Sequence, residues 1–306
     1  MNQSQKKFIP VMLMPFNEDK SIDYVSLEKL IEFYLNAGAE GLFANCLSSE
    51  MFELTKDEMI ESVTFVINKV NGRVPVVATG TFQENIKEQA HFVKEIYKTG
   101  VDAVIVITSL LAGEEDDDSV FETNVRELIE LTPNIPLGFY ECPLPYKRVL
   151  SANFLGELVK TKRVIYHKDT SLNMVSIESK LRETVDEPAF GLYDAYMVHA
   201  VESLKAGSKG LSCIQGNYFP ELIVWLCENY NSIENSSKVI EVQKFLREQM
   251  DVIHYAYPAS AKYYLSLNNF PINITCRRTD IEDLDESTKQ RIEELKKDYE
   301  ILRSTL

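Results

Sequence analysis

Lys168 is a candidate amine nucleophile because of its place in the chain. It comes near the end of an apolar, strand-like stretch that begins at Val164. Side chains alternate along a β-strand, so Tyr166, Lys168 and Thr170 would share one face, with His167 on the other. Partial burial lowers the pKa of a lysine, and the neutral amine can then attack a carbonyl carbon. By itself the stretch favours an ordinary solvated lysine, so the order of the other elements must decide.

Tyr140 is the natural partner for such an amine. It ends the strand-like run 136–140, which is the run that precedes the Lys168 stretch. If the two runs are neighbouring strands, Tyr140 and Lys168 lie side by side, and a phenol next to an amine can transfer protons while an imine forms. His167 would then point away into the outer layer, where we expect a structural role.

Apolar runs and helical spacing alternate along the chain in a way that predicts the fold. Eight strand-then-helix units follow one another, and their strands are almost continuously apolar, as in a parallel sheet covered on both faces. Eight units predict an α/β protein with a closed (β/α)8 TIM barrel. A doubly wound open sheet is the main alternative, but no Gly-x-Gly-x-x-Gly follows the first run. The strands are expected at residues 8–16, 41–45, 74–79, 103–108 and 136–140, from 164, around 189, and at 210–214.

The same pattern predicts how the chain is divided. Residues 1–218 would form the barrel. Residues 219–306 read as mainly helical, with amphipathic stretches and a highly charged end. We therefore expect a C-terminal helical extension that packs on the barrel.

The composition is that of an ordinary soluble globular protein. The chain has 306 residues, 45% hydrophobic and 26% charged, and its net charge of -15 opposes binding to nucleic acid or to an anionic membrane. No apolar run approaches membrane-spanning length, and the N-terminus lacks the apolar core of a signal peptide. Five widely spaced cysteines indicate reduced thiols in a cytoplasmic protein, and the four histidines form no local metal pattern. We expect neither a metal nor a cofactor.

In a barrel of this kind the chemistry takes place at the C-terminal ends of the strands. Lys168 and Tyr140 both lie at such ends, and the turn after the second strand would bring hydroxyl groups to the same mouth. The further residues expected to bind substrate there are Leu47, Ser48, Ser49, Tyr166 and Ile214.

Four features together carry a family resemblance. They are the phrase at 10–23, the turn that ends in Glu50, Tyr140 followed by Cys142-Pro143, and Lys168 followed by Asp169-Thr170-Ser171. In this order and spacing the chain resembles the dihydrodipicolinate synthase and N-acetylneuraminate lyase family of pyruvate-dependent class I aldolases. The resemblance covers nearly the whole chain, and none of the four features would be sufficient alone.

The resemblance implies roles for particular residues. Lys168 would form a Schiff base with a 2-oxo acid such as pyruvate, and Tyr140 would be the phenol that transfers protons. The turn at Leu47 and Ser48 would hold the carboxylate of the oxo acid through the Ser48 hydroxyl and backbone amides. A small 2-oxo acid or sugar acid is the implied partner, and a homotetramer or homodimer is the implied assembly.

The chain also departs from the family pattern. The family commonly has Gly-Thr-Thr-Gly-Glu or Gly-Ser-Thr-Gly-Glu where this chain has Cys-Leu-Ser-Ser-Glu at 46–50. Leu47 therefore lacks the hydroxyl that relays protons in the family, and Leu110 and Leu111 stand where dihydrodipicolinate synthases have two tyrosines. Tyr166 replaces a residue that is commonly glycine. It either fills the space of the lost groups, which we favour, or supplies a replacement hydroxyl.

These observations lead to one main hypothesis and three alternatives. The main hypothesis is a Schiff-base-forming lyase or aldolase that makes or breaks a carbon–carbon bond next to pyruvate or a related 2-oxo acid. Dehydration of a 2-keto-3-deoxy sugar acid would use the same imine. Dihydrodipicolinate synthase itself is disfavoured by Leu47, by Leu111 and by the lack of the family's arginine near Pro145, where the nearest cations are Lys147 and Arg148. A barrel that binds an oxo acid without turnover is the hypothesis from another class.

Overall fold

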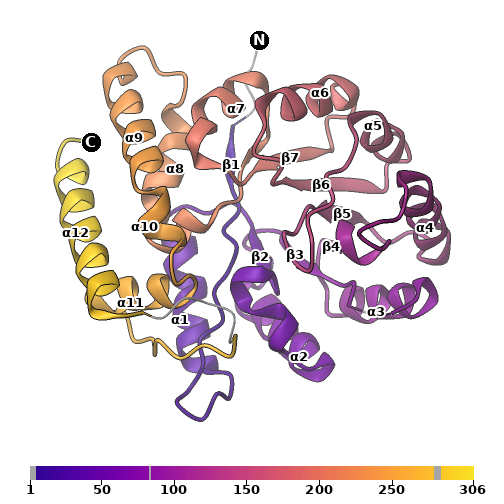
Figure 1. The fold of residues 1–306 in the computed structure, drawn as a ribbon, viewed down its shortest axis with the longest axis horizontal. Coiled ribbons are helices and arrows are strands. Elements are labelled where there is room, and N and C mark those ends of the chain that lie inside the picture. The colour runs from indigo at the N-terminus through magenta and orange to yellow at the C-terminus, as the bar shows by residue number, and fades with distance from the viewer. Residues whose placement is uncertain (1–4, 83, 279–283) are drawn as a thin grey trace.

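The structure is a computed structural model that describes residues 5–82, 84–278 and 284–306. Within these residues the strands form one parallel sheet surrounded by helices (Figure 1). The strands are buried along almost their whole length, because helices cover the outside of the sheet and side chains fill its inside. The strands are β1 (Lys7–Phe8), β2 (Leu42–Ala44), β3 (Val76–Thr79), β4 (Ala103–Ile107), β5 (Leu137–Tyr140), β6 (Val164–Asp169), β7 (Gly191–Asp194) and β8 (Gly210–Leu211).

The sheet closes into a barrel through the segment that follows β1. The strand order is β1-β8-β7-β6-β5-β4-β3-β2, which leaves β1 and β2 at the two ends. Val11 forms a parallel bridge to Phe43 of β2. Met12 N donates to Phe43 O, and Phe43 N donates to Pro10 O, each over 3.0 Å. The predicted (β/α)8 TIM barrel with C-terminal helices is confirmed.

The first strand is shorter than the sequence predicts. The apolar run 8–16 predicts a long strand, but only Lys7–Phe8 pairs with β8 as a ladder. Pro10 and Pro15 have no backbone N–H to donate, so this run cannot sustain a regular ladder. The other strands lie within or beside the expected runs.

The helices around the barrel begin and end at residues with clear local reasons. Thr55 and Glu58 form a capping box before α2: Thr55 Oγ1 accepts from Glu58 N over 3.2 Å, and Glu58 Oε2 accepts from Thr55 N over 2.9 Å. Gly38 follows α1 with φ of 96°, a conformation that favours glycine. The barrel helices are α1 (Tyr24–Asn36), α2 (Lys56–Val70), α3 (Ile86–Lys98), α4 (Asp118–Leu131), α5 (Ala152–Lys160), α6 (Met174–Thr184), α7 (Ala200–Ala206) and α8 (Pro220–Asn229).

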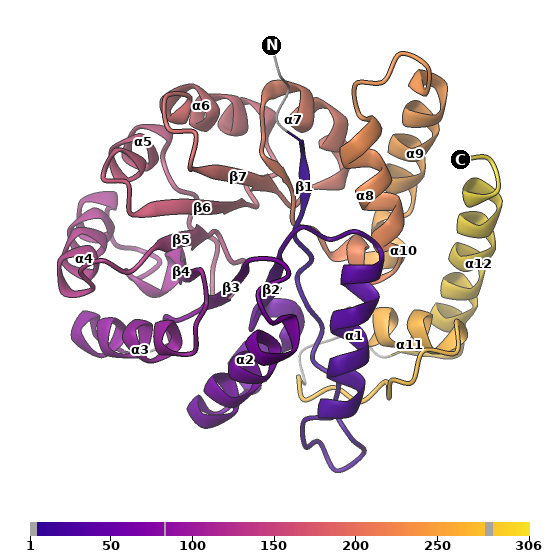
Figure 2. The same cartoon turned by 180° about the vertical axis from the view of Figure 1, so that it is seen from behind.

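The C-terminal helices gather on one side of the barrel, as both views show (Figures 1 and 2). Helix α8 packs against β1 and β8 and completes the ring, although it begins after residue 218. The predicted boundary at 218 therefore separates β8 from the barrel helix that follows it, and the division into two domains stays a prediction. Among the described residues, no helix is both long and apolar enough to cross a membrane. The remaining helices are α9 (Ser236–Glu248), α10 (Met250–His254), α11 (Ala259–Leu267) and α12 (Glu286–Arg303).

Candidate active site

Lys168 and Tyr140 lie side by side at the C-terminal ends of neighbouring strands. The two residues are direct partners in the register of β5 and β6. The Nζ atom of Lys168 lies 4.3 Å from the centre of the Tyr140 ring and 5.9 Å from the centre of the Phe43 ring. The amine therefore sits over aromatic faces in the barrel mouth.

Burial determines the protonation of both groups. Lys168 is 4% exposed, and within the described residues its side chain forms no hydrogen bond or ion pair with a carboxylate. Burial lowers the pKa of Lys168 below the ordinary lysine value. Burial, followed by the nearby Cys142 thiol, raises the pKa of Tyr140 well above its ordinary value, and burial raises the pKa of Cys142 to about 11. The arrangement favours a neutral amine next to a phenol and a thiol that keep their protons.

A cavity of about 320 Å³ opens at this end of the barrel. Five of the residues that the sequence assigned to the site line it: Lys168, Tyr140, Leu47, Ser48 and Ile214. The volume is at the small end of the range for small-molecule sites, which suits a compact ligand. The other lining residues are Pro143, Lys147, Thr170, Leu172, Ala195, Tyr196, His254, Tyr257 and Arg278.

Tyr166 and Ser49 do not line this cavity. The hydroxyl of Tyr166 donates to Ser212 Oγ over 3.1 Å, and its ring stacks on Tyr193 with centroids 4.8 Å apart. Ser49 Oγ donates to Met12 O over 2.7 Å and accepts from Cys46 N over 3.1 Å. Tyr166 thus fills the barrel interior below the mouth, and Ser49 fixes the fold of its turn. We assign neither side chain a direct ligand contact.

The turn that carries Leu47 and Ser48 is held from behind by the C-terminal region. Glu50 ends the turn with φ of 55°, and its carboxylate is buried. Lys262 Nζ donates to Glu50 Oε1 over 2.8 Å, while the backbone N–H groups of Arg277 and Arg278 donate to Glu50 Oε2 over 2.6 and 2.9 Å. A buried carboxylate needs such partners, so the packing of the C-terminal region and the shape of the turn depend on one another.

Several residues that line the cavity could not be identified as site residues from the sequence. Tyr257 and Arg278 reach the mouth only because the C-terminal region packs over it, and no local pattern marks them. Of the two cations near the expected arginine, Lys147 lines the cavity and donates to Thr170 O over 2.9 Å. Arg148 instead pairs with Asp118 over 2.8 Å, outside the cavity lining.

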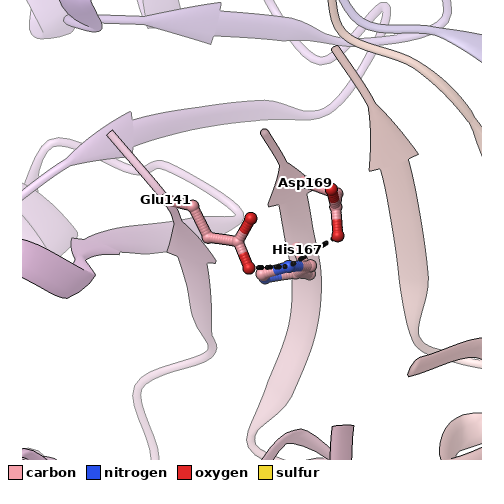
Figure 3. Close-up of side chains that lie close together, drawn as sticks. All are labelled: Glu141, His167 and Asp169. Atoms are coloured by element: carbon pink, nitrogen blue, oxygen red, sulfur yellow. Dashed lines mark ion pairs between the residues drawn. The ribbon is translucent and has the colours of Figure 1, made fainter. Parts of the chain in front are cut away.

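A cluster of charged side chains lies on the opposite face of the same strands (Figure 3). Glu141, His167 and Asp169 are fully buried and point toward one another. His167 Nε2 lies 3.3 Å from Glu141 Oε1 and 3.8 Å from Asp169 Oδ2. Lys180 of α6 reaches in, pairs with Glu141, and places Nζ 2.6 Å from Asp169 Oδ2. Glu141, His167 and Asp169 are residue types that can bind a metal ion. The ammonium group of Lys180, however, already balances the charge of the two carboxylates.

The ionisable groups of this buried cluster shift the pKa values of one another. Burial alone would lower the pKa of His167, but Asp169 and Glu141 outweigh it, so the pKa is raised. The pKa of Lys180 is also raised, because Glu141 and Asp169 outweigh the effect of burial. Burial opposes ionisation of Asp169, yet His167 and Lys180 hold its pKa well below the ordinary value. His167 therefore has a structural place between β6 and α6, and it does not line the cavity.

Comparisons with known proteins agree with this architecture. The sequence profile of the Dihydrodipicolinate synthetase family matches residues 4–298. The chain is 26% identical to the 4-hydroxy-tetrahydrodipicolinate synthase of Oceanobacillus iheyensis over 298 residues, which cover 96% of this chain and 97% of that protein. It is 23% identical to the enzyme of the same name from Bacillus subtilis over 262 residues, 85% of this chain and 88% of that one.

Solved structures give the same result for the fold. YagE, a prophage protein of the dihydrodipicolinic acid synthase family from E. coli K12 solved with pyruvate, has a TM-score of 0.85 at 20% identity, covering 96% of this chain and 98% of that chain. CdNal from Clostridium difficile, solved with mannosamine, has a TM-score of 0.83 at 18% identity, covering 97% and 99%. At these identities the likeness establishes the barrel fold. Because the profile matches nearly the whole chain, the protein belongs to the dihydrodipicolinate synthetase family.

Proposed function

We propose that the protein is a Schiff-base-forming lyase or aldolase that makes or breaks a carbon–carbon bond next to pyruvate or a related 2-oxo acid. The observation that carries this proposal is the environment of Lys168. Its amine is buried in the mouth of the barrel, has no carboxylate partner among the described residues, and lies over the ring of Tyr140. An amine that is to attack a carbonyl must be neutral, and this environment favours the neutral form.

The chemistry follows from the two groups. The lone pair of the Lys168 nitrogen forms a bond to the ketone carbon of the oxo acid, and the carbonyl oxygen takes up a proton. The nitrogen gives up one of its two protons, the oxygen leaves as water after a second protonation, and a protonated imine remains. The imine draws electrons from the adjacent carbon–carbon bond when it breaks, or supplies an enamine when the bond forms. Tyr140, whose phenol keeps its proton, is the donor and acceptor for these transfers.

The identity of the oxo acid rests on size and on similarity. A cavity of about 320 Å³ has room for pyruvate together with a short second substrate. YagE, which shares the fold, was solved with pyruvate. Ser48 lines the cavity beside Lys168 and is our candidate for holding the oxo acid carboxylate.

We do not extend the proposal to the reaction named for the curated relatives. Leu47 lines the cavity and offers no hydroxyl to it. Leu111 is buried in the apolar core, and Arg148 pairs with Asp118. The proton relay and the arginine that the family resemblance implies for dihydrodipicolinate synthase are therefore not supplied by these positions.

Reductive trapping tests the proposed function. The protein is incubated with pyruvate and borohydride, and the adduct is found by intact mass and peptide mapping. We expect one reduced pyruvate on the peptide that contains Lys168, and no adduct in Lys168→Ala. Lys147→Ala is the matched control, because Lys147 is the other lysine of the cavity lining and should not be needed for labelling. An adduct that persists in Lys168→Ala would exclude the proposed nucleophile.

Failure with every 2-oxo acid would instead favour a barrel that binds without turnover. That outcome counts only if Lys168 still reacts with small amine reagents, since a blocked amine could not report on the chemistry. We also propose a homotetramer or homodimer, on the basis of the family resemblance. Sedimentation that gives only monomer at working concentrations would contradict it.

A further inference from the structure

Apolar side chains from three different strand ends line the cavity. Leu47 follows β2, Leu172 follows β6 and Ile214 follows β8. Leu47 and Ile214 are partly buried and pack against the apolar cluster of the barrel interior, which contains Phe43 and Tyr140. The apolar interior of the barrel is therefore continuous with the lining of the cavity in which Lys168 lies.

Leu172 is an exposed apolar residue on a backbone that its neighbours hold in place. It is 49% exposed, and its φ of 61° lies in the left-handed region that leucine rarely adopts. On one side, Ser171 N and Oγ donate to the buried Asp169 Oδ1 over 2.8 and 2.6 Å. On the other, Asn173 Oδ1 accepts from Val175 N over 2.9 Å and caps α6. Unusual backbone of this kind persists where the surroundings enforce it, and it is typical of functional sites.

The side chains that line the cavity offer few hydrogen-bond acceptors. Among the described residues of the lining there is no aspartate, glutamate, asparagine or glutamine. Lys147 Nζ already donates to Thr170 O, and Thr170 Oγ1 donates to Glu141 O. A chain with many hydroxyl groups needs acceptors as well as donors, because each hydroxyl that leaves water without a partner weakens binding. The described lining therefore suits a ligand with an apolar chain.

We propose that the carbonyl partner of the 2-oxo acid is an apolar aldehyde whose chain packs on Leu172, Ile214 and Leu47. Covering the exposed Leu172 side chain removes apolar surface from water, which favours binding. This inference rests on the proposed function, because the aldehyde must react with an enamine held on Lys168. It names the substrate class of the same site and makes Leu172 a residue that determines specificity.

The reaction balances without an oxidant or a reductant. The imine of pyruvate on Lys168 loses a proton from its methyl carbon and becomes an enamine. That carbon forms a bond to the aldehyde carbon, and the aldehyde oxygen takes up a proton. Water then adds to the imine carbon, the amine of Lys168 leaves, and the product is a 4-hydroxy-2-oxo acid with the apolar chain on its fourth carbon. Cleavage runs through the same steps in reverse.

The test compares two aldehydes in four proteins. Butanal and glyceraldehyde are similar in size, but butanal has an apolar chain and glyceraldehyde carries two hydroxyl groups. Each is combined with saturating pyruvate, and the 4-hydroxy-2-oxo acid is measured by mass spectrometry to give kcat/KM. The proteins are wild type, Leu172→Asn, Leu172→Met and Val175→Asn. Asparagine tolerates the left-handed backbone of position 172, and Val175 is the matched control because it is 70% exposed on the first turn of α6, outside the cavity lining.

We expect wild type to use butanal with a kcat/KM at least about tenfold higher than that for glyceraldehyde. Leu172→Asn should lower kcat/KM for butanal by about tenfold, since a lost apolar contact in a substrate pocket has an effect of that size. The value for glyceraldehyde should stay within about twofold of wild type, and Leu172→Met and Val175→Asn should leave both aldehydes within the same range. Equal losses for both aldehydes in Leu172→Asn would overturn the inference, because a merely structural role would affect them alike.

Borohydride trapping of pyruvate in the same proteins separates failure of this inference from failure of the proposed function. We expect all four proteins to form the adduct at Lys168, which also shows that the variants keep a folded site. An adduct in wild type together with equal or better use of glyceraldehyde, or with no condensation of either aldehyde, would overturn the inference alone. Absence of the adduct in wild type would overturn both.

Discussion

Lys168 and Lys180 are two buried lysines on opposite sides of the same strand, and their environments differ completely. Lys168 faces the cavity and, within the described residues, has no carboxylate partner; burial lowers its pKa. Lys180 reaches the outer face of β6, where Glu141 and Asp169 raise its pKa despite burial. The two residues have the same chemical type and similar depth. Their partners make one a candidate nucleophile and the other a structural cation.

The alternation of β-strands accounts for both sites at once. In β6, Lys168 points to the cavity, while His167 and Asp169 point to the cluster with Lys180. The chain repeats this at the end of β5, where Tyr140 lines the cavity and Glu141 belongs to the cluster. The ion-paired cluster around Lys180 therefore holds the ends of β5 and β6, which carry Tyr140 and Lys168 on their other face.

The largest expected change in stability comes from Lys180→Met. It would leave two carboxylates buried with His167 as their only remaining cation in the cluster. Removing one partner of a buried ion pair costs about 3–5 kcal/mol, so we expect a loss of that size in the free energy of unfolding, measured by urea denaturation. Lys160→Met, an exposed change on the neighbouring helix α5, should cost less than about 0.5 kcal/mol. Equal costs for the two variants would show that the cluster adds no stability.

A change of opposite sign is expected for Lys168→Met. The buried amine has no hydrogen-bonding partner among the described residues, and methionine has a similar length without the polar group. We expect the free energy of unfolding to rise by about 1 kcal/mol, since burial disfavours the charged form of the amine and methionine has no charge to desolvate. Trapping of pyruvate should be abolished in the same variant. A marked loss of stability would mean that Lys168 has a stabilising partner after all.

A smaller effect should appear in the pH dependence of stability. Because the pKa of His167 is raised on folding, its stabilising contribution is complete below the unfolded value of about 6.5 and is lost as pH rises through the folded value. Wild type should therefore lose more stability than His167→Gln as pH is raised above about 6.5. Thermal unfolding of both proteins across this range gives the comparison, and parallel curves would rule out a protonated His167 in the folded protein.

The contrast between the two lysines also marks the limit of what the sequence predicts. Strand order and alternation place Tyr140 beside Lys168 and turn His167 away, because these relations depend on local periodicity and on the order of βα units. The partner of Glu141 and Asp169 does not follow from the sequence. Lys180 lies on a helix whose rotation against the sheet is set by packing.

The residues that the C-terminal region contributes to the cavity cannot be predicted from the sequence, for the same physical reason. Tyr257 and Arg278 line the cavity only because of tertiary packing. The ion pair of Lys262 with Glu50 likewise connects segments more than two hundred residues apart in the sequence. The shortness of β1 was foreseeable in part, because Pro10 and Pro15 interrupt the apolar run. Tyr166 was expected to fill space, and its stacking on Tyr193 is compatible with that interpretation.

The measurement that tests the central claim most directly is the pH profile of pyruvate trapping at Lys168, read by peptide mapping under single-turnover conditions. The rate should rise with the fraction of neutral amine and reach its plateau below the ordinary lysine pKa of 10.5, because burial lowers the pKa of Lys168. Lys180 should remain unlabelled throughout, since Glu141 and Asp169 keep it charged. A rate that keeps rising to pH 10.5, or an adduct on any other lysine, would contradict the assignment of Lys168 as the unpaired, neutral nucleophile.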